Sequence, residues 1–205
     1  MMKTKHIVLV LALFLAVMIL PSAAFALSSG APGLSDYTYS AGDRYSAKEY
    51  KIAFGTEPYL EGNSVWPVYS APALDAVRGA KGKASLATNG DVYTGGWSGA
   101  WLMVRYPKNN GGFRVGWVPK SVINRTIKRT KQCNFAYWTI TVGQNCELTD
   151  DPLYESETLA YASKGEKLTY LGFYQYQNGR EYAYVQGDLN GHPVCGFIPF
   201  SAIDW

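Results

Sequence analysis

Apolar and polar residues alternate over short stretches along most of the chain, a periodicity typical of β-strands. From Tyr50 onward, segments rich in aromatic and β-branched residues recur at intervals of about ten residues and are separated by glycine-containing turns. In residues 101–105 and 182–186, Leu, Val and Ala side chains share one face of the expected strand and the aromatic ones share the other. The pattern therefore predicts an all-β fold of short strands, with the aliphatic face toward the core.

A nine-residue segment recurs 80 residues further along the chain. Residues 115–123 (VGWVPKSVI) align with residues 195–203 (CGFIPFSAI), and glycine, proline, serine and isoleucine are identical in the two copies. The same offset aligns residues 68–72 with residues 148–152, which are both expected strands that run into a proline. The sequence therefore predicts two similar units of about 70 residues, each large enough to form its own small core.

With small gaps, further segments of the two units also match: residues 92–97 with 169–174, and residues 101–104 with 182–185. The resulting organisation has five parts: an N-terminal segment at 1–26, a flexible lead-in at 27–49, a first unit at 50–124, a basic linker at 125–135 and a second unit at 136–205.

The N-terminal segment has the layout of a secretory signal peptide. Lys3 and Lys5 precede an apolar run over residues 7–20, and the small-residue site at 24–26 follows. A membrane span needs about 20 apolar residues, and this run is shorter. We expect cleavage after Ala26, a secreted or wall-associated protein and no membrane span in the remaining chain.

The charge balance argues against a dedicated nucleic-acid binder. Removal of the two N-terminal lysines lowers the formal net charge from +3 to +1. Proteins that bind nucleic acid through their phosphates carry a dense basic surface, which this composition lacks. We therefore expect no nucleic-acid partner.

The two copies of the repeated motif, GWVP at 116–119 and GFIP at 196–199, resemble the closing strand of bacterial SH3 domains from exported proteins. Residues 101–104, a glycine-rich hairpin at 109–112 and the closing motif follow one another in the order that such domains show. The resemblance implies two tandem small SH3-like barrels. It also implies a non-catalytic protein that holds cell-envelope material, namely peptidoglycan peptide or glycan.

Exposed aromatic rings can stack on sugar or peptide planes, and the alternative role for each ring is packing inside a barrel. The aromatic candidates for ligand contact are Tyr69, Tyr93, Trp97, Trp101, Tyr174, Tyr176, Tyr182 and Tyr184. We expect Trp117 and Phe197, which alternate with aliphatic neighbours in the closing strands, to lie in the core. Val122 and Ala202 replace the groove tyrosine of eukaryotic SH3 domains, which argues against recognition of proline-rich motifs.

A basic run in the linker is a candidate contact for anionic wall polymers, and its alternative role is that of a solvated linker. Its charged residues are Arg125, Lys128, Arg129 and Lys131.

A Cys–His hydrolase is the catalytic alternative, with Cys146 or Cys195 as the nucleophile and His192 as the base. Cys195 matches Val115 in the other copy, which favours a small apolar strand residue, and we expect no enzymatic activity. The chain has a third cysteine, Cys133, so at most one internal disulfide can form. The sequence does not decide whether Cys146 and Cys195 form it. No zinc-binding spacing occurs, so we expect no metal and no cofactor.

Two polar segments have both a chemical and a structural interpretation. The acidic residues Asp150, Asp151, Glu155 and Glu157 could bind calcium or cleave sugars, and the alternative is a polar loop around a proline. Residues 79–85 approximate a phosphate-binding loop but lack its first glycine and its hydroxyl residue, which favours a simple turn.

The competing function is a structural or regulatory module that binds another exported protein by strand addition. The sequence leaves the oligomeric state open.

Overall fold

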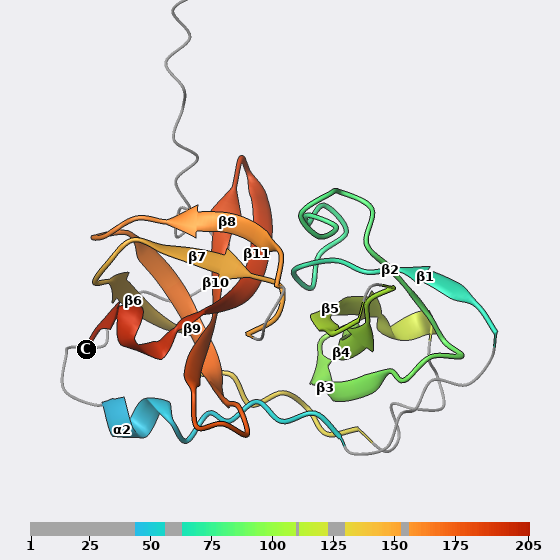
Figure 1. Ribbon diagram of the computed structural model, residues 1–205, viewed down its shortest axis with the longest axis horizontal. Coiled ribbons are helices and arrows are strands. Elements are labelled where there is room, and N and C mark those ends of the chain that lie inside the picture. The colour runs from blue at the N-terminus through green and yellow to red at the C-terminus, as the bar shows by residue number, and fades with distance from the viewer. Residues whose placement is uncertain (1–43, 56–62, 110, 123–129, 153–155) are drawn as a thin grey trace, which may run out of the picture.

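The computed structural model describes residues 44–55, 63–109, 111–122, 130–152 and 156–205 (Figure 1). The fold of these residues is all β, as predicted. The expected signal peptide at 1–26 and the first 17 residues of the expected lead-in lie outside the described residues. No helix in the described ranges is long and apolar enough to cross a membrane.

The first group of strands, which we call the first lobe, contains a two-stranded sheet and a three-stranded sheet in the order β3-β4-β5, all antiparallel. Its elements are β1 (Val65–Pro67), β2 (Ser85–Ala87), β3 (Tyr93–Ser98), β4 (Trp101–Pro107), β5 (Phe113–Pro119) and the 3-10 helix η1 (Lys120–Val122).

The second lobe is one antiparallel sheet of seven strands in the order β12-β6-β9-β10-β11-β7-β8, and Figure 1 shows it beside the first lobe. Its elements are β6 (Trp138–Val142), β7 (Cys146–Thr149), β8 (Thr158–Ala162), β9 (Lys167–Gln175), β10 (Glu181–Leu189), β11 (His192–Pro199), the 3-10 helix η3 (Phe200–Ala202) and β12 (Ile203–Asp204).

Each lobe buries the aliphatic face that its strand pattern predicts. Leu102 and Val104 of β4 are fully buried in the core of the first lobe. Ala183 and Val185 of β10 are fully buried in the core of the second. Because side chains alternate between the faces of a strand, the intervening residues must point away from these two cores.

The strand register aligns the two copies of the repeated motif and shifts one of the gapped matches by one residue. Trp101 pairs with Pro119 in the first lobe, and Tyr182 pairs with Pro199 in the second, so Trp101 and Tyr182 are equivalent. By the same register, Trp97 is equivalent to Phe173, whereas the sequence match places it one residue further on. The same irregularity occurs in both copies, at Gly95 in β3 and at Leu171 in β9, and the register places these two residues at equivalent positions.

The second face of the central strands is buried between the lobes. We call this cluster the interlobe core; it contains Met103, Val115 and Trp117 from the first lobe and Leu171, Tyr184, Cys195 and Phe197 from the second. Trp117 and Phe197 are at most 1% exposed. They are core residues, as expected, but they lie in the cluster shared by the two lobes rather than in the core of either lobe.

The lobes meet through equivalent positions of the repeat. The backbone N–H of Val115 donates to the carbonyl of Asp150 at 2.8 Å, and the N–H of Cys195 donates to the carbonyl of Ser70 at 3.2 Å. Each residue of the first contact lies 80 positions from its counterpart in the second. The interlobe contact is therefore approximately twofold symmetric, like the isologous interface of a homodimer.

The N-terminal described segment lies along both lobes. The helix α2 (Arg44–Ala47) packs on the second lobe, where Ala47 is fully buried and its carbonyl accepts a hydrogen bond from the Tyr170 hydroxyl at 2.8 Å. Ile52 then donates to the carbonyl of Phe173 at 2.8 Å. The sequence assigns the helix to a flexible lead-in, because a helix of four residues is too short to show a hydrophobic period.

Candidate functional site: a basic cleft between the lobes

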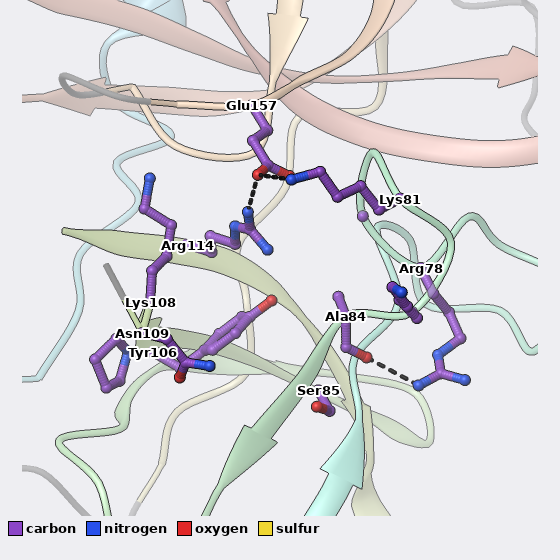
Figure 2. Close-up of a pocket in the computed structure, with 12 residues that line it drawn as sticks. Arg78, Lys81, Ala84, Ser85, Tyr106, Lys108, Asn109, Arg114 and Glu157 are labelled. Atoms are coloured by element: carbon purple, nitrogen blue, oxygen red, sulfur yellow. Dashed lines mark hydrogen bonds and ion pairs between the residues drawn. The ribbon is translucent and has the colours of Figure 1, made fainter. Parts of the chain in front are cut away.

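A cleft of about 310 Å³ opens where the two lobes meet (Figure 2). Five basic side chains line it, together with a single acidic one, Glu157. The basic residues are Arg78, Lys81, Lys83, Lys108 and Arg114. All five come from the first lobe, and Glu157 comes from the loop that precedes β8 of the second, so the cleft requires both lobes.

A tight turn holds one wall of the cleft. Residues 79–82 form a turn in which Gly79 and Gly82 have φ angles of +67° and +69°, a conformation that glycine adopts readily. The ends of the loop are tied by two hydrogen bonds, from Ala84 N–H to the Arg78 carbonyl at 2.8 Å and from the Arg78 guanidinium to the Ala84 carbonyl at 3.0 Å. The turn predicted from the sequence is confirmed, and it presents an exposed lysine to the cleft.

The opposite wall is built on the β4–β5 hairpin. Tyr106 of β4 pairs directly with Arg114 of β5, and both side chains line the cleft. Tyr106 is only 4% exposed, and this burial raises the pKa of its hydroxyl to about 12. The hydroxyl therefore stays neutral near pH 7, and the positive charge of this wall comes from Arg114 and Lys108.

Arg114 is the centre of an ion-pair cluster that crosses the interlobe contact. Its Nε lies 2.9 Å from Oδ2 of Asp150, and its Nη2 lies 2.6 Å from Oε1 of Glu157. The Nζ of Lys81 lies 3.4 Å from the same Glu157 oxygen. Burial raises the pKa of the Asp150 carboxyl, although the hydrogen bond from the Glu157 N–H and the nearby guanidinium act in the opposite direction.

Two of the four acidic residues identified in the sequence, Asp150 and Glu157, are therefore ion-pair partners of Arg114. Asp150 and Asp151 are at most 4% exposed, and Glu155 lies outside the described residues. Among the residues that the structure describes, no three His, Cys, Asp or Glu side chains gather closely enough to hold a metal ion.

The charged groups of this cluster break the symmetry of the repeat. Arg114 is equivalent to Val194, Asp150 to Ser70, and Glu157 to Val77. The backbone is nevertheless the same in both copies: Asp150 N–H donates to the Glu157 carbonyl at 3.1 Å, and Ser70 N–H donates to the Val77 carbonyl at 2.7 Å. This backbone contact therefore does not require the charged side chains. The sequence did not lead us to predict the cleft. The signal that points to it is the presence of charged residues at positions where the other copy of the repeat has serine or valine.

Four of the eight predicted aromatic candidates pack against the interlobe core. Tyr69, Trp101, Tyr174 and Tyr182 are half-buried and pack against it. The rings of Tyr69 and Trp101 meet edge to face, with 5.4 Å between their centroids. These side chains therefore contribute to the contact between the lobes, and only part of each ring is accessible.

Tyr184 is the candidate whose placement differs most from the expectation. Its side chain is 1% exposed, and its hydroxyl accepts a hydrogen bond from Nε1 of Trp117 at 2.9 Å. The prediction of a ligand contact at Tyr184 is corrected here, because the second lobe face is covered by the first lobe.

The remaining aromatic candidates lie outside the interlobe core and are half-buried. Trp97 donates from Nε1 to the Thr130 carbonyl at 3.1 Å, and the Lys120 ammonium lies 4.0 Å from its ring centroid. Tyr93 packs edge to face on Phe113, with ring centroids 5.9 Å apart. Tyr176 is half-buried beyond the end of β9.

Little of the basic linker is described. Lys131 is exposed, and its carbonyl accepts a hydrogen bond from the Trp97 N–H at 3.1 Å. The other three candidates, Arg125, Lys128 and Arg129, lie outside the described residues. A contact with anionic polymers through this linker stays a prediction.

The thiols are poorly placed for nucleophilic chemistry. Cys195 and His192 are three positions apart on β11, so their side chains project to opposite faces of the strand. Burial raises the pKa of the Cys195 thiol, and it raises the pKa of Cys146 to about 11 and that of Cys133 to about 12. All three thiols are free in the structure, and each stays protonated near neutral pH.

Comparison with known proteins gives no family assignment. No family model matches the chain, and no curated protein matches it either. Among solved structures, NlpC2 from Trichomonas vaginalis shows 14% sequence identity and a TM-score of 0.26. That match covers 71% of this chain and 45% of the NlpC2 chain, and a similarity this low supports no argument about function.

Proposed function

We propose that this chain is an exported, non-catalytic protein of two SH3-like lobes that binds peptidoglycan, and that the basic cleft holds the carboxylates of the peptidoglycan peptides. The observation that carries the proposal is the convergence of five basic side chains and one acidic side chain on a cleft of about 310 Å³. The raised pKa values of the three thiols argue against a cysteine-dependent reaction.

The physical properties of the cleft suit a polymer with repeated negative groups. Ion pairs between exposed side chains contribute about 0.2–1 kcal/mol each, so one cleft of this kind binds a single carboxylate weakly. An insoluble polymer presents many carboxylates at high local concentration, and rebinding compensates for weak individual contacts. The partly accessible rings of Tyr69 and Trp101 do not line the cleft, and they offer a separate apolar surface for the glycan or peptide.

Co-sedimentation with insoluble peptidoglycan tests the proposal. The wall material is used before and after its anionic polymers are stripped, over a range of salt concentrations. We expect the chain to sediment with stripped peptidoglycan and to lose binding as the salt concentration rises, because the contact is charged and solvent-accessible. Binding that disappears on stripping would instead indicate anionic polymers and the basic linker.

A pair of lysine variants locates the site. Lys83→Ala combined with Lys108→Ala removes two charges from the cleft, and we expect it to weaken sedimentation. Lys164→Ala combined with Lys167→Ala removes two exposed charges from the second lobe and serves as the matched control. Equal binding by the two double variants would contradict the assignment of the cleft.

The second candidate function is capture of another exported protein by strand addition. It is favoured by β8, which lies at one edge of the seven-stranded sheet and carries Tyr161, whose side chain is 64% exposed. Absence of wall binding together with recovery of one stoichiometric protein partner would support this function over the first.

A further inference from the structure

We propose that Glu157 occupies the carboxylate subsite of the cleft in the free protein and that a ligand carboxylate displaces it. The inference rests on the proposed function, because it concerns the same cleft and names what its ligand must replace. Glu157 then competes with the ligand for the subsite, so the apparent affinity of the cleft for a carboxylate depends partly on a residue of the chain itself. We call such a site self-competing.

Glu157 already shows which chemical group the cleft accepts. One of its carboxylate oxygens lies 2.6 Å from Nη2 of Arg114 and 3.4 Å from Nζ of Lys81. Figure 2 shows the side chain entering from the second lobe, with both cations of the first lobe directed toward it. Two cations that converge on one carboxylate oxygen form a subsite for a carboxylate.

The rest of the cluster allows Glu157 to leave. Arg114 keeps a second partner, because its Nε lies 2.9 Å from Oδ2 of Asp150, whose side chain is 4% exposed. The Glu157 side chain is 26% exposed and can turn toward solvent. Its departure therefore leaves no buried cation without a counter-charge, which would otherwise be costly.

The backbone at Glu157 is held independently of its side chain. The N–H of Glu157 donates to Oδ1 of Asp150 at 2.9 Å, and its carbonyl accepts from the N–H of Asp150 at 3.1 Å. In the other copy of the repeat, Val77 makes the same backbone contact without a carboxylate. Displacement thus needs only a side-chain rotation, and the fold itself has no need for an acid at this position.

The size of the competition follows from the two contacts. A ligand carboxylate must replace the interactions of Glu157 with Arg114 and Lys81, and Lys81 is 75% exposed. Partly solvent-accessible ion pairs contribute little individually, and we expect removal of the competing carboxylate to tighten binding by about fivefold.

Calorimetric titration with citrate, a soluble tricarboxylate, tests the inference in the full chain at low salt. We expect Glu157→Gln to bind citrate about fivefold more tightly than the wild type. Glu147→Gln is the matched control, because it removes the same charge from an exposed position on β7 outside the cleft, and it should bind as the wild type does. Equal or weaker binding by Glu157→Gln, or no citrate binding by any of the three proteins, would overturn the inference.

A second measurement keeps the test valid if Glu157→Gln is poorly folded. In the wild type, citrate should shift the NMR signals of the Arg114 guanidinium, because that group exchanges one carboxylate for another. Unchanged Arg114 signals at saturating citrate would contradict displacement. A parallel titration with inorganic phosphate separates carboxylate recognition from general anion binding, since tighter binding of phosphate than of citrate would refute the assigned ligand class.

The outcome is distinguishable from that of the proposed function. If the citrate results are as expected but no variant sediments with peptidoglycan, the self-competing subsite stands and the proposed ligand is wrong. If peptidoglycan is bound and Glu157→Gln gains no affinity for citrate, the proposed function stands and the role of Glu157 is wrong.

Discussion

Substitution of Tyr184 by phenylalanine removes a hydrogen bond that crosses the interlobe core. The Tyr184 hydroxyl accepts a hydrogen bond from Nε1 of Trp117 at 2.9 Å. Because Trp117 belongs to the first lobe and Tyr184 to the second, this hydrogen bond crosses the interlobe core. Phenylalanine keeps the ring and removes the oxygen alone.

The expected cost follows from burial. Trp117 and Tyr184 are at most 1% exposed, so water cannot replace the lost acceptor. A buried N–H left without a partner costs about 1–3 kcal/mol, and we expect Tyr184→Phe to lower the free energy of unfolding by about 2 kcal/mol. With a denaturant dependence of roughly 2 kcal/mol per molar urea, the unfolding midpoint falls by about 1 M.

Urea denaturation followed by tryptophan fluorescence and by circular dichroism measures this change, and agreement of the two probes tests for a single transition. Tyr161→Phe is the control, because that side chain is 64% exposed and its hydroxyl can be replaced by water. A Tyr184→Phe midpoint equal to that of the control would refute the reasoning, since it would mean that the buried hydrogen bond between the lobes is not formed.

Three further predictions concern packing, charge and thiol reactivity. Gly196→Ala should lower the free energy of unfolding by about 2 kcal/mol, because the added Cβ would lie 2.7 Å from a backbone oxygen of β7. Gly90→Ala is the control: its Cβ would have no contact closer than 3.4 Å, and its stability should stay within about 0.5 kcal/mol of the wild type. Equal urea midpoints for the two variants would contradict this prediction. Arg114→Met should destabilise by about 3 kcal/mol by leaving Asp150 buried without a counter-charge. Urea unfolding at several pH values should show this cost shrinking as the pH falls, because protonation of a carboxyl with a raised pKa removes the buried charge; a cost independent of pH would argue against it. Alkylation of Cys146 by iodoacetamide, followed by peptide mass spectrometry, should accelerate up to about pH 11, and a plateau near the ordinary thiol pKa of about 8.5 would refute the raised value.

The sequence pattern predicts the strands and the two lobe cores well, because alternation depends only on local geometry. Leu102 and Val104 face a core, as their spacing indicates, and the closing motifs form equivalent strands that each end in a short 3-10 helix. Alternation also shows that β10 has a second, aromatic face. It does not show what covers that face, which is why Tyr184 is a ligand candidate in the sequence and a buried residue in the structure.

The cleft depends on segments that are distant in the sequence. A turn near Lys81, the hairpin strand with Arg114 and the loop with Glu157 meet only through the packing of the two lobes. No local period predicts such a meeting. The repeat nevertheless gives one indication of the cleft. Asp150 and Glu157 are charged, whereas the equivalent residues of the first copy are serine and valine.

The central claim is that the basic cleft binds the carboxylates of peptidoglycan peptides. The most direct measurement is sedimentation of the chain with stripped peptidoglycan before and after its free carboxylates are converted to amides. We predict that amidation removes most of the binding, because Arg114 and the cleft lysines lose their counter-charges. Undiminished binding to the amidated wall would contradict the claim and would move the contact to the glycan and the aromatic rings.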